Sequence, residues 1–444
     1  MSLTRRELLS GLAATAAISA SAPSFAPFPW AQRVGDNSLR IDASRLQQSL
    51  EGLSVFGRPA GGSFADGVSR VAYSDADVAG RKYAMHLMRS AALDPHIDAA
   101  GNITARRPGT DLSLKPIVFG SHIDSVPSGG NFDGDLGSMA AIEVLHTLND
   151  NHVTTRHPLR MYIWQNEEGG LVGSHFAAGE PEDLGRQFYG LTVAQGIRKL
   201  GGDPANLAQV RIPKDSFECY LELHIEQGAN LAKAGIPIGI VEGIVAIDEY
   251  EVEICGFANH AGTTPMPERR NALLAAAMLI EAVQQVVTSK PGRQVGTVGR
   301  LAVYPNAPNV VPGRVVHTIE LRDLSTEKVA CLAAKIEKRA WQIAKQTNTE
   351  ITIKKVSTDP PAMASPEVQK QIEAAANALG LKTMGMPSGA GHDAQMMARL
   401  GPMGMIFVPS VGGISHSPRE LTPWADCANG ANVLLQTVLA IDRQ

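Results

Sequence analysis

Three short apolar runs in this 444-residue chain each lead into side chains that can bind a metal or move a proton. The runs span residues 116–119, 159–164 and 219–223, and they lead into His122, Glu167-Glu168 and His224. Runs of this length, bounded by turn residues, are typical of buried strands. In α/β sheets, the carboxyl ends of parallel strands form the edge where sites commonly lie. The pattern therefore predicts an α/β fold with a polar site at one edge of its sheet.

The order of the predicted elements changes near residue 241. From there to residue 357 the sequence predicts strand, helix, strand, strand, helix and strand, which is the order of a ferredoxin-like domain. From residue 358 the sequence again predicts helices and strands like those before residue 241. We therefore expect a two-domain α/β protein. Residues 36–240 and 358–444 would form the larger domain, and residues 241–357 a ferredoxin-like (βαββαβ) domain inserted in it.

The composition is that of a globular protein and gives no support for nucleic acid as a partner. Hydrophobic residues make up 44% of the chain and charged residues 19%, and the formal net charge is −4. Because there is no excess of positive charge to attract phosphates, we expect a small molecule or a peptide as substrate and not nucleic acid. The four cysteines form no Cys-x-x-Cys pair, so neither a zinc ribbon nor a redox dithiol is predicted.

Residues 1–26 resemble a twin-arginine export signal. Arg5 and Arg6 precede an uncharged run rich in alanine and leucine, which ends in a small-residue cleavage pattern at Ala26. Pro23 and Pro27 interrupt the run before it reaches the roughly 20 residues that a membrane-spanning helix needs. We expect a periplasmic or secreted protein without a stable membrane anchor.

The residues at the predicted strand ends have the chemistry of a two-metal site. Two divalent ions of the zinc type need a bridging carboxylate, further imidazole and carboxylate ligands, and an open position for water. Asp133, in a tight Asn-Phe-Asp-Gly-Asp turn, is the candidate bridge. We expect His122 and His224 to complete one site, and Glu168 and His416 the other. Zinc is the expected metal, although manganese, cobalt and nickel also suit such ligands.

Two more acidic residues have expected roles beside the metals. Asp124, two residues after His122, is expected to hold the His122 imidazole in one tautomer and orientation. Glu167 is free to face the bound water, so we expect it to act as general base and later as general acid. A lone histidine or a Glu-Glu-Gly turn is more often structural. The prediction therefore rests on the five ligands together, which all lie at predicted strand ends or in loops.

Seven motifs together resemble those of a known enzyme family. They are GSHIDSV, NFDGDLG, NEEGG, ELHIEQG, NHAGTTPM, SGAGHDA and SHSP followed by Glu420. In this order, from about residue 40 to the C-terminus, they resemble the hydantoinase/carbamoylase amidases of the M20 di-zinc hydrolases. The resemblance implies a homodimer in which the inserted domain serves as lid and dimerisation domain. It also implies that metal-activated water attacks a ureido or amide carbonyl.

The same resemblance implies several contacts with the substrate. Arg322 matches the family's carboxylate-binding arginine, and a guanidinium can hold a carboxylate with two hydrogen bonds. Gln227 and Asn309 can bond ureido or carboxylate oxygens. His260 is expected to come from the partner subunit and to donate a hydrogen bond to the developing oxyanion.

Two more stretches carry expectations from the resemblance. The loop that contains Gly389 and Gly391 is expected to offer backbone N–H groups to the substrate, while His392 orders the loop and is not a sixth metal ligand. The family commonly has Asp where this chain has Asn271. We expect Asn271 to cap the following helix as a neutral group.

The leading prediction is an amidohydrolase that removes the carbamoyl group of an N-carbamoyl-L-amino acid or a related ureido acid. Allantoate amidohydrolase remains an alternative, because the same ligands would serve a substrate with two ureido groups. An aminoacylase or dipeptidase is a second alternative, although His224 argues against it, since the related peptidases usually have Asp or Glu there. A non-catalytic binding protein is the third, and it would be expected to lack a ligand or the base.

Overall fold

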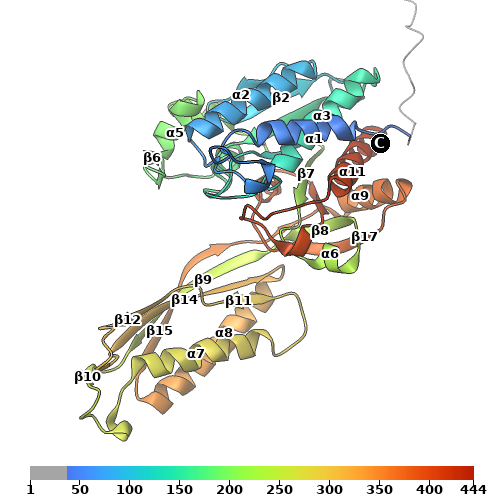
Figure 1. Ribbon diagram of the computed structural model, residues 1–444. Helices are drawn as coiled ribbons and strands as arrows, with labels where there is room; N and C mark the ends of the chain where they lie inside the picture. Colours follow the sequence, from blue (N-terminus) through green and yellow to red (C-terminus); the bar gives the residue numbers. More distant parts are fainter. Residues whose placement is uncertain (1–37) are drawn as a thin grey trace, which may run out of the picture.

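The computed structural model describes residues 38–444, so the predicted export signal at residues 1–26 lies outside the described residues. Its larger sheet has nine strands in the order β1-β2-β4-β3-β7-β18-β8-β16, with β17 paired to β8 (Figure 1). Parallel pairing joins the central strands β4 (Leu159–Trp164), β3 (Ile117–His122), β7 (Cys219–Ile225) and β18 (Met403–Val408). The outer strands are β1 (His96–Ile97), β2 (Ile103–Arg107), β8 (Ile238–Ile244), β16 (Ala362–Met363) and β17 (Thr383–Ser388).

Helices cover both faces of the larger sheet, which confirms the predicted α/β class. One face carries α1 (Ala43–Leu53), α2 (Asp75–Ser90), α3 (Asp135–Asp150), α9 (Pro366–Ala378) and α11 (Trp424–Asp442). These helices bury their apolar sides against strand residues such as Phe119 and Leu221. On the other face, α4 (Val172–Ala178) and α10 (Asp393–Met397) pack with Tyr162, Trp164 and Tyr220.

A second sheet lies apart from the first, with its own two helices on one face (Figure 1). Its order is β11-β14-β9-β15, and β12 also pairs with β14. The elements are β9 (Ala246–Cys255), α7 (Ala272–Val287), β11 (Val295–Thr297), β12 (Leu301–Tyr304), β14 (Arg314–Asp323), α8 (Thr326–Thr347) and β15 (Glu350–Asp359). Asn271 caps α7, because its side chain accepts the N–H groups of Leu273 and Leu274 at 3.0 and 3.2 Å.

The structure shifts the predicted boundaries of the inserted segment. Residue 241 falls inside β8, which pairs with β17 and β18 of the larger sheet, and residue 357 falls inside β15. Only Val245 separates β8 from β9. The apolar pattern therefore continues from one sheet into the other without a turn signal, which is why the sequence does not mark the change. The second sheet extends from Ala246 to Asp359.

Short elements connect these parts. They are η1 (Phe64–Asp66), β5 (Gln187–Phe188), β6 (Leu191–Thr192), α5 (Val193–Leu200), η2 (Leu207–Val210), α6 (Asn230–Ala234), β10 (Asn259–His260), η3 (Met266–Glu268), β13 (Val310–Val311) and η4 (Val411–Gly413). Within residues 38–444, no helix combines the length and the apolar character needed to cross a membrane.

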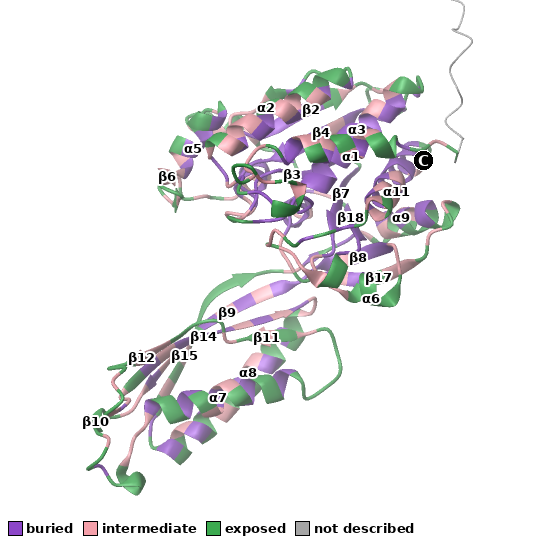
Figure 2. Cartoon of the chain, in the orientation of Figure 1, coloured by how far each residue is buried: buried purple, intermediate pink, exposed green. Residues whose placement is uncertain are grey.

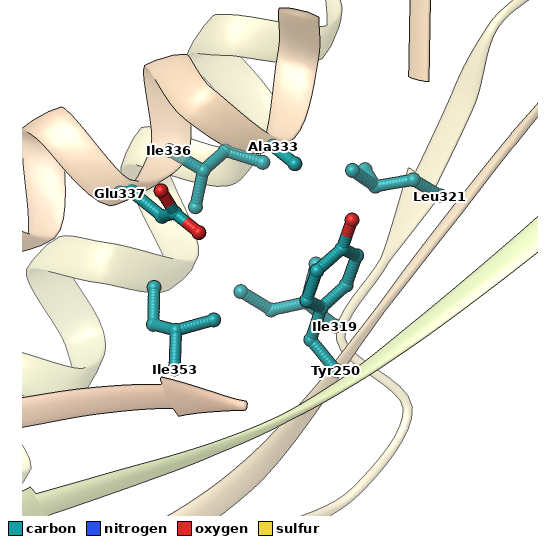
Figure 3. Close-up of a pocket in the computed structure, with 7 residues that line it drawn as sticks. All are labelled: Tyr250, Ile319, Leu321, Ala333, Ile336, Glu337 and Ile353. Atoms are coloured by element: carbon teal, nitrogen blue, oxygen red, sulfur yellow. The ribbon is translucent and has the colours of Figure 1, made fainter. Parts of the chain in front are cut away.

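The strands of the larger sheet are more deeply buried than those of the second sheet (Figure 2). Every residue of β3, β7 and β18 is buried, whereas most residues of β15 are exposed. A small pocket lies between α8 and the second sheet, lined by apolar side chains together with the Tyr250 hydroxyl and the Glu337 carboxylate (Figure 3). This pocket belongs to the packing of the second sheet and contains none of the predicted metal ligands.

A buried ion pair connects the segment before α2 with the start of α3. Arg70 and Asp135 form a salt bridge, and their side chains are 0% and 3% exposed. The Arg70 guanidinium also donates to the backbone carbonyls of Leu53, Phe56 and Ile123. Removing one partner of a buried pair leaves the other charge without compensation, which costs far more than losing an exposed pair. Arg70 therefore holds together the elements that support the start of α3.

We expect Arg70→Met to lower the free energy of unfolding by about 3–5 kcal/mol, because Asp135 loses its buried cation. A matched control is Arg300→Met, which removes an ion pair with Glu251 whose side chains are 63% and 47% exposed. The control should lower the free energy of unfolding by no more than about 1 kcal/mol. Urea unfolding followed by circular dichroism measures both changes. Equal unfolding midpoints for the two variants would contradict this account of Arg70.

Candidate metal centre

The parallel strands of the larger sheet bring the predicted ligands to one edge. His122 is the last residue of β3, and His224 is the last but one of β7. Glu167 and Glu168 follow the end of β4 in a short turn. Because β3 pairs in parallel with both β4 and β7, the carboxyl ends of these strands lie side by side. The edge predicted from the apolar runs is therefore present.

Asp133, in the turn before α3, lies between two groups of candidate ligands. Its Oδ1 is 3.1 Å from His224 Nε2 and 3.6 Å from His122 Nε2. Its Oδ2 is 3.4 Å from His416 Nε2, which lies 3.5 Å from Glu168 Oε2. Within each group the ligand atoms are within 4.8 Å of one another. A carboxylate that turns one oxygen to each group has the arrangement that a bridging ligand needs.

The backbone orients both imidazoles of the first group. His122 Nδ1 lies 3.0 Å from the Asp124 carbonyl oxygen, and His224 Nδ1 lies 2.9 Å from the Ile225 carbonyl oxygen. A carbonyl can only accept, so each Nδ1 carries a proton and donates it, and in the neutral imidazole Nε2 has the lone pair. His122 Nε2 is buried and has no hydrogen-bond partner among residues 38–444, as expected of an atom that binds a metal.

The structure corrects the contact predicted for Asp124. Its carboxylate is 4.0 Å from His122 Nδ1, and the group that accepts the His122 N–H is the Asp124 backbone carbonyl. The carboxylate instead accepts the backbone N–H groups of Glu167 and Glu168, at 3.1 and 3.2 Å. The sequence does not reveal this contact, because the two glutamates follow a different strand. The Asp124 side chain thus positions the glutamate turn and not the His122 ring.

Burial raises the pKa values of three acidic side chains at this edge. It raises the pKa of Asp124 to about 6 and, together with the Asp133 charge, the pKa of Glu168 to about 8. Burial and the Glu168 charge hold the pKa of Glu167 well above its ordinary range. Several carboxylates are therefore buried side by side, and nearby positive charge would favour their ionised forms.

The histidines respond differently to the same surroundings. Burial lowers the pKa of His122 to about 4, so its imidazole is neutral. A hydrogen bond with Asp133 raises the pKa of His416 to about 9. Burial opposes protonation of His224, but the closer Asp133 carboxylate outweighs it and raises the pKa of that imidazole to about 9. Asp133 therefore attracts positive charge on both of its sides, and metal ions compete with protons for such ligands.

Three further side chains hold Asp133. Glu420 Oε1 accepts the Asp133 backbone N–H at 3.1 Å. Asp133 Oδ2 accepts hydrogen bonds from Ser415 Oγ at 2.9 Å and from Gln227 Nε2 at 2.7 Å. The sequence predicts no role for Ser415 or Glu420, and it predicts that Gln227 contacts only the substrate. Glu420 ends the SHSP-containing motif four residues after His416. Its place in that motif is the sequence feature that could have indicated a role at the site.

The structure brings only some of the predicted substrate residues to this edge. Arg322, in β14, reaches the larger domain, because its Nη1 donates to the Gly389 carbonyl at 2.6 Å. Asn309 and His260 lie together elsewhere, where β10 pairs with β13 and the Ala261 N–H donates to the Asn309 carbonyl at 2.9 Å. Figure 1 shows β10 at the end of the second sheet that is remote from β7. One chain therefore does not bring His260 or Asn309 to its own metal ligands.

The loop that contains Gly389 and Gly391 lies beside His224. Ser388 Oγ and His392 Nε2 are 2.9 Å apart and form a hydrogen bond across the loop. The His392 ring packs against the His224 ring, with centroids 4.4 Å apart. Neither group of candidate ligand atoms includes His392. His392 therefore contacts both the loop and His224, and its role in ordering the loop without being a ligand stays a prediction.

Comparison with known proteins identifies the family. Residues 118–440 match the model of peptidase family M20/M25/M40. The chain belongs to this family. It is 39% identical to an N-carbamoyl-L-amino acid amidohydrolase of Geobacillus stearothermophilus over 90% of this chain and 98% of that protein. It is 36% identical to a ureidoglycolate hydrolase of Arabidopsis thaliana, over 90% of this chain and 87% of that one. An allantoate amidohydrolase of Escherichia coli is 31% identical, over 88% and 95%.

A solved structure extends the comparison to the fold. A hydantoinase/carbamoylase family amidase from Burkholderia multivorans has a TM-score of 0.84 and 33% identity, and the match covers 92% of this chain and 99% of that chain. Hydrolases of the M20 family are metal-dependent. The donor set of this M20 chain fits a divalent metal, because imidazole Nε2 atoms and carboxylate oxygens converge at one edge, where the first group is buried and His416 of the second is exposed.

Gly134 gives a direct test of the first ligand group. Its φ is 66°, and a Cβ at this position would overlap the His122 imidazole. We expect Gly134→Ala to displace the ring and to weaken zinc binding at least tenfold, on the order of the loss from a disturbed metal-ligand contact. Gly235→Ala is the matched control, since Gly235 has a φ of 63° and open space around it. Zinc titration against a chromophoric chelator measures both variants. If the two titrations coincided, Gly134 would not be shaping the centre.

Proposed function

We propose that this chain hydrolyses the carbamoyl group of N-carbamoyl-L-amino acids or related ureido acids, giving the amine, carbon dioxide and ammonia. The observation that carries the proposal is the Asp133 carboxylate, with a group of metal-binding side chains facing each of its oxygens. The names of three relatives, which each match this chain over about nine-tenths of its length, support the choice of ureido acids.

Two divalent cations are proposed as cofactors. Asp133, His122 and His224 would hold one of them, and Asp133, Glu168 and His416 the other. Zinc suits this donor set, and manganese, cobalt and nickel suit it as well, so the supply of metal decides among them. When bound, such ions polarise a carbonyl and lower the pKa of water.

Glu167 is proposed to carry the proton. Its Oε2 is 3.6 Å from His122 Nε2, so the carboxylate lies beside the first ligand group. The Asp124 carboxylate accepts the Glu167 N–H and fixes the turn. A carboxylate in this place can take a proton from the attacking water and return it to the departing amine nitrogen. Burial raises the pKa of Glu167 above its ordinary range, which is the direction that favours holding the proton before it is returned.

Arg322 and the loop at Gly389 are proposed to bind the substrate carboxylate. Arg322 Nε donates to Glu320 Oε1 at 2.8 Å and Nη1 donates to the Gly389 carbonyl, which fixes the guanidinium where the second sheet meets the larger domain. The N–H groups that remain can form a paired contact with a carboxylate. The backbone N–H groups of the loop from Gly389 to Gly391 are proposed to contact the same end of the substrate.

A homodimer is proposed to complete the site through the second sheet, acting as lid and dimerisation domain. His260 is exposed, and its Nδ1 accepts the N–H groups of Gly262 and Thr263 at 3.0 and 3.2 Å. Nε2 therefore carries the proton and is free to donate. Such a donor suits the developing oxyanion of a neighbouring subunit. Asn309, held beside His260, would enter the neighbouring site with it. Export to the periplasm or the exterior is proposed from the twin-arginine pattern of residues 1–26 alone.

Allantoate and ureidoglycolate are the second candidate substrates, because relatives named for their hydrolysis match this chain over about nine-tenths of its length. A panel of N-carbamoyl-L-amino acids, ureidoglycolate and allantoate tests the choice with the metal-reconstituted protein. Release of a free α-amino acid with the highest kcat/KM supports the first proposal. Preferred release of ammonia from allantoate or ureidoglycolate supports the second. Hydrolysis of N-acetyl amino acids or dipeptides in preference to every ureido acid would contradict both.

Substituting the proposed base separates chemistry from metal binding. We expect Glu167→Gln to lower kcat at least 100-fold, since general acid–base catalysis contributes roughly that much or more. Its metal content should stay that of the wild type, because Glu167 is not a member of either ligand group. Steady-state assays with elemental analysis of the same sample measure both quantities. Turnover near the wild-type rate would remove Glu167 from this role.

A further inference from the structure

A tyrosine occupies the tip of the short hairpin formed by β5 and β6. Only Tyr189 and Gly190 connect the two strands, and their φ values are 46° and 86°. Two-residue turns with positive φ at both positions strongly prefer asparagine followed by glycine, because a bulky residue is strained there. Tyr189 is 65% exposed, so burial of its ring does little to offset the strain. Backbone strain of this kind is concentrated at sites that bind ligands.

Tyr189 borders a pocket that adjoins Glu168, a member of the second ligand group. The pocket has a volume of about 270 Å³, and Phe188 of the same hairpin also lines it. The Arg186 guanidinium carbon lies 4.7 Å from the centre of the Phe188 ring, and Arg186 Nη2 donates to the Gly169 carbonyl at 3.1 Å. Since Gly169 follows Glu168 directly, Arg186 fastens the hairpin to the turn that carries the two glutamates.

The lining of this pocket suits an uncharged apolar or aromatic group. Apolar side chains form part of its wall, and they are Ala72, Val126, Phe188 and Tyr189. The described residues that line it include the acids Asp124 and Glu168 but no lysine, arginine or histidine, so an anionic group would be repelled. A group of the size of water or an amine needs only about 10–15 Å³ of such space. The pocket is therefore much larger than the terminal amine of a carbamoyl group requires.

This pocket and the proposed carboxylate site adjoin different ligand groups. Arg322 contacts the loop at Gly389, which lies beside His224 of the first group. The pocket instead adjoins Glu168, whose group faces the other oxygen of Asp133. In an N-carbamoyl amino acid, the carbamoyl carbon has the amino-acid part on one side and the terminal nitrogen on the other. A carbamoyl group between the two ligand groups, with its carboxylate end at Arg322, therefore turns its terminal nitrogen towards the pocket.

We infer that this pocket binds a substituent on the terminal ureido nitrogen, so that the chain also hydrolyses ureido acids in which that nitrogen carries an apolar or aromatic group. The inference rests on the proposed function and widens its range of substrates. Water adds to the ureido carbon, the bond from that carbon to the amino-acid nitrogen breaks, and this nitrogen gains a proton. The products are the free amino acid and an N-substituted carbamic acid, which loses carbon dioxide to leave the amine. Tyr189 is thereby a specificity-determining residue for the substituent.

N-(phenylcarbamoyl)-L-alanine, compared with N-carbamoyl-L-alanine, tests the inference with the metal-reconstituted protein. We expect the wild type to release L-alanine from both compounds and aniline from the first, as measured by chromatography. Isothermal titration calorimetry with Glu167→Gln gives the dissociation constants, because this variant is expected to bind the compounds without hydrolysing them. The phenyl derivative should bind at least as tightly as the unsubstituted compound, because its ring occupies the pocket.

Tyr189→Asn, made in the Glu167→Gln background, removes the ring and gives the Asn-Gly pair that this turn prefers. It should weaken binding of the phenyl derivative about two- to tenfold more than binding of N-carbamoyl-L-alanine, as expected for one lost aromatic contact. Tyr189→Phe is the matched control variant, and it should keep the affinity for the phenyl derivative. N-carbamoyl-L-phenylalanine is the matched control ligand, because its ring lies on the amino-acid side. Tyr189→Asn should weaken its binding no more than that of N-carbamoyl-L-alanine.

Hydrolysis of N-carbamoyl-L-alanine without hydrolysis of the phenyl derivative would overturn the inference and leave the proposed function standing. Equal losses of affinity for these two compounds in Tyr189→Asn would overturn it as well, because the ring would not be recognised at Tyr189. A loss confined to N-carbamoyl-L-phenylalanine would also overturn it, since the pocket would then hold the amino-acid side chain. A protein that hydrolyses no ureido acid would instead overturn the proposed function on which the inference rests.

Discussion

The arrangement of this protein depends on how the Asp133 carboxylate is held. Each of its oxygens faces a different group of metal-binding side chains, and its backbone N–H donates to Glu420. The carboxylate stands where a tight turn passes through Gly134 into α3. Since an added Cβ at Gly134 would overlap His122, the turn and the first ligand group require each other. The same turn therefore positions both the Asp133 carboxylate and the His122 ring.

Buried contacts in the core stabilise this turn. Asp135, the first residue of α3, is paired with the buried Arg70, which also holds carbonyls from the segments around α1 and β3. The parallel strands β3, β4 and β7 fix His122, Glu168 and His224 relative to α3. A change in the core is therefore transmitted to His122 and His224, because both lie at the ends of buried strands.

Much of this architecture is predictable from the sequence, for identifiable physical reasons. Apolar runs that end in His122, Glu168 and His224 predict the edge of an α/β sheet, and the structure places those residues there. The Asp124 contact was predicted wrongly, because its true partners come from another strand and sequence spacing carries no information about them. The boundary near residue 241 was misplaced for a similar reason. The strands β8 and β9 form one continuous apolar pattern but belong to different sheets.

Metal stoichiometry tests the central claim, which is that Asp133 serves both ligand groups. Elemental analysis of purified wild type, Asp133→Ala and His122→Ala, with folding checked by circular dichroism, gives the required comparison. We expect about two transition-metal ions per wild-type subunit, since a bridged centre holds a pair. We expect almost none in Asp133→Ala, and a loss of mainly one ion in His122→Ala. Two ions retained in Asp133→Ala would contradict the bridge and the account built on it.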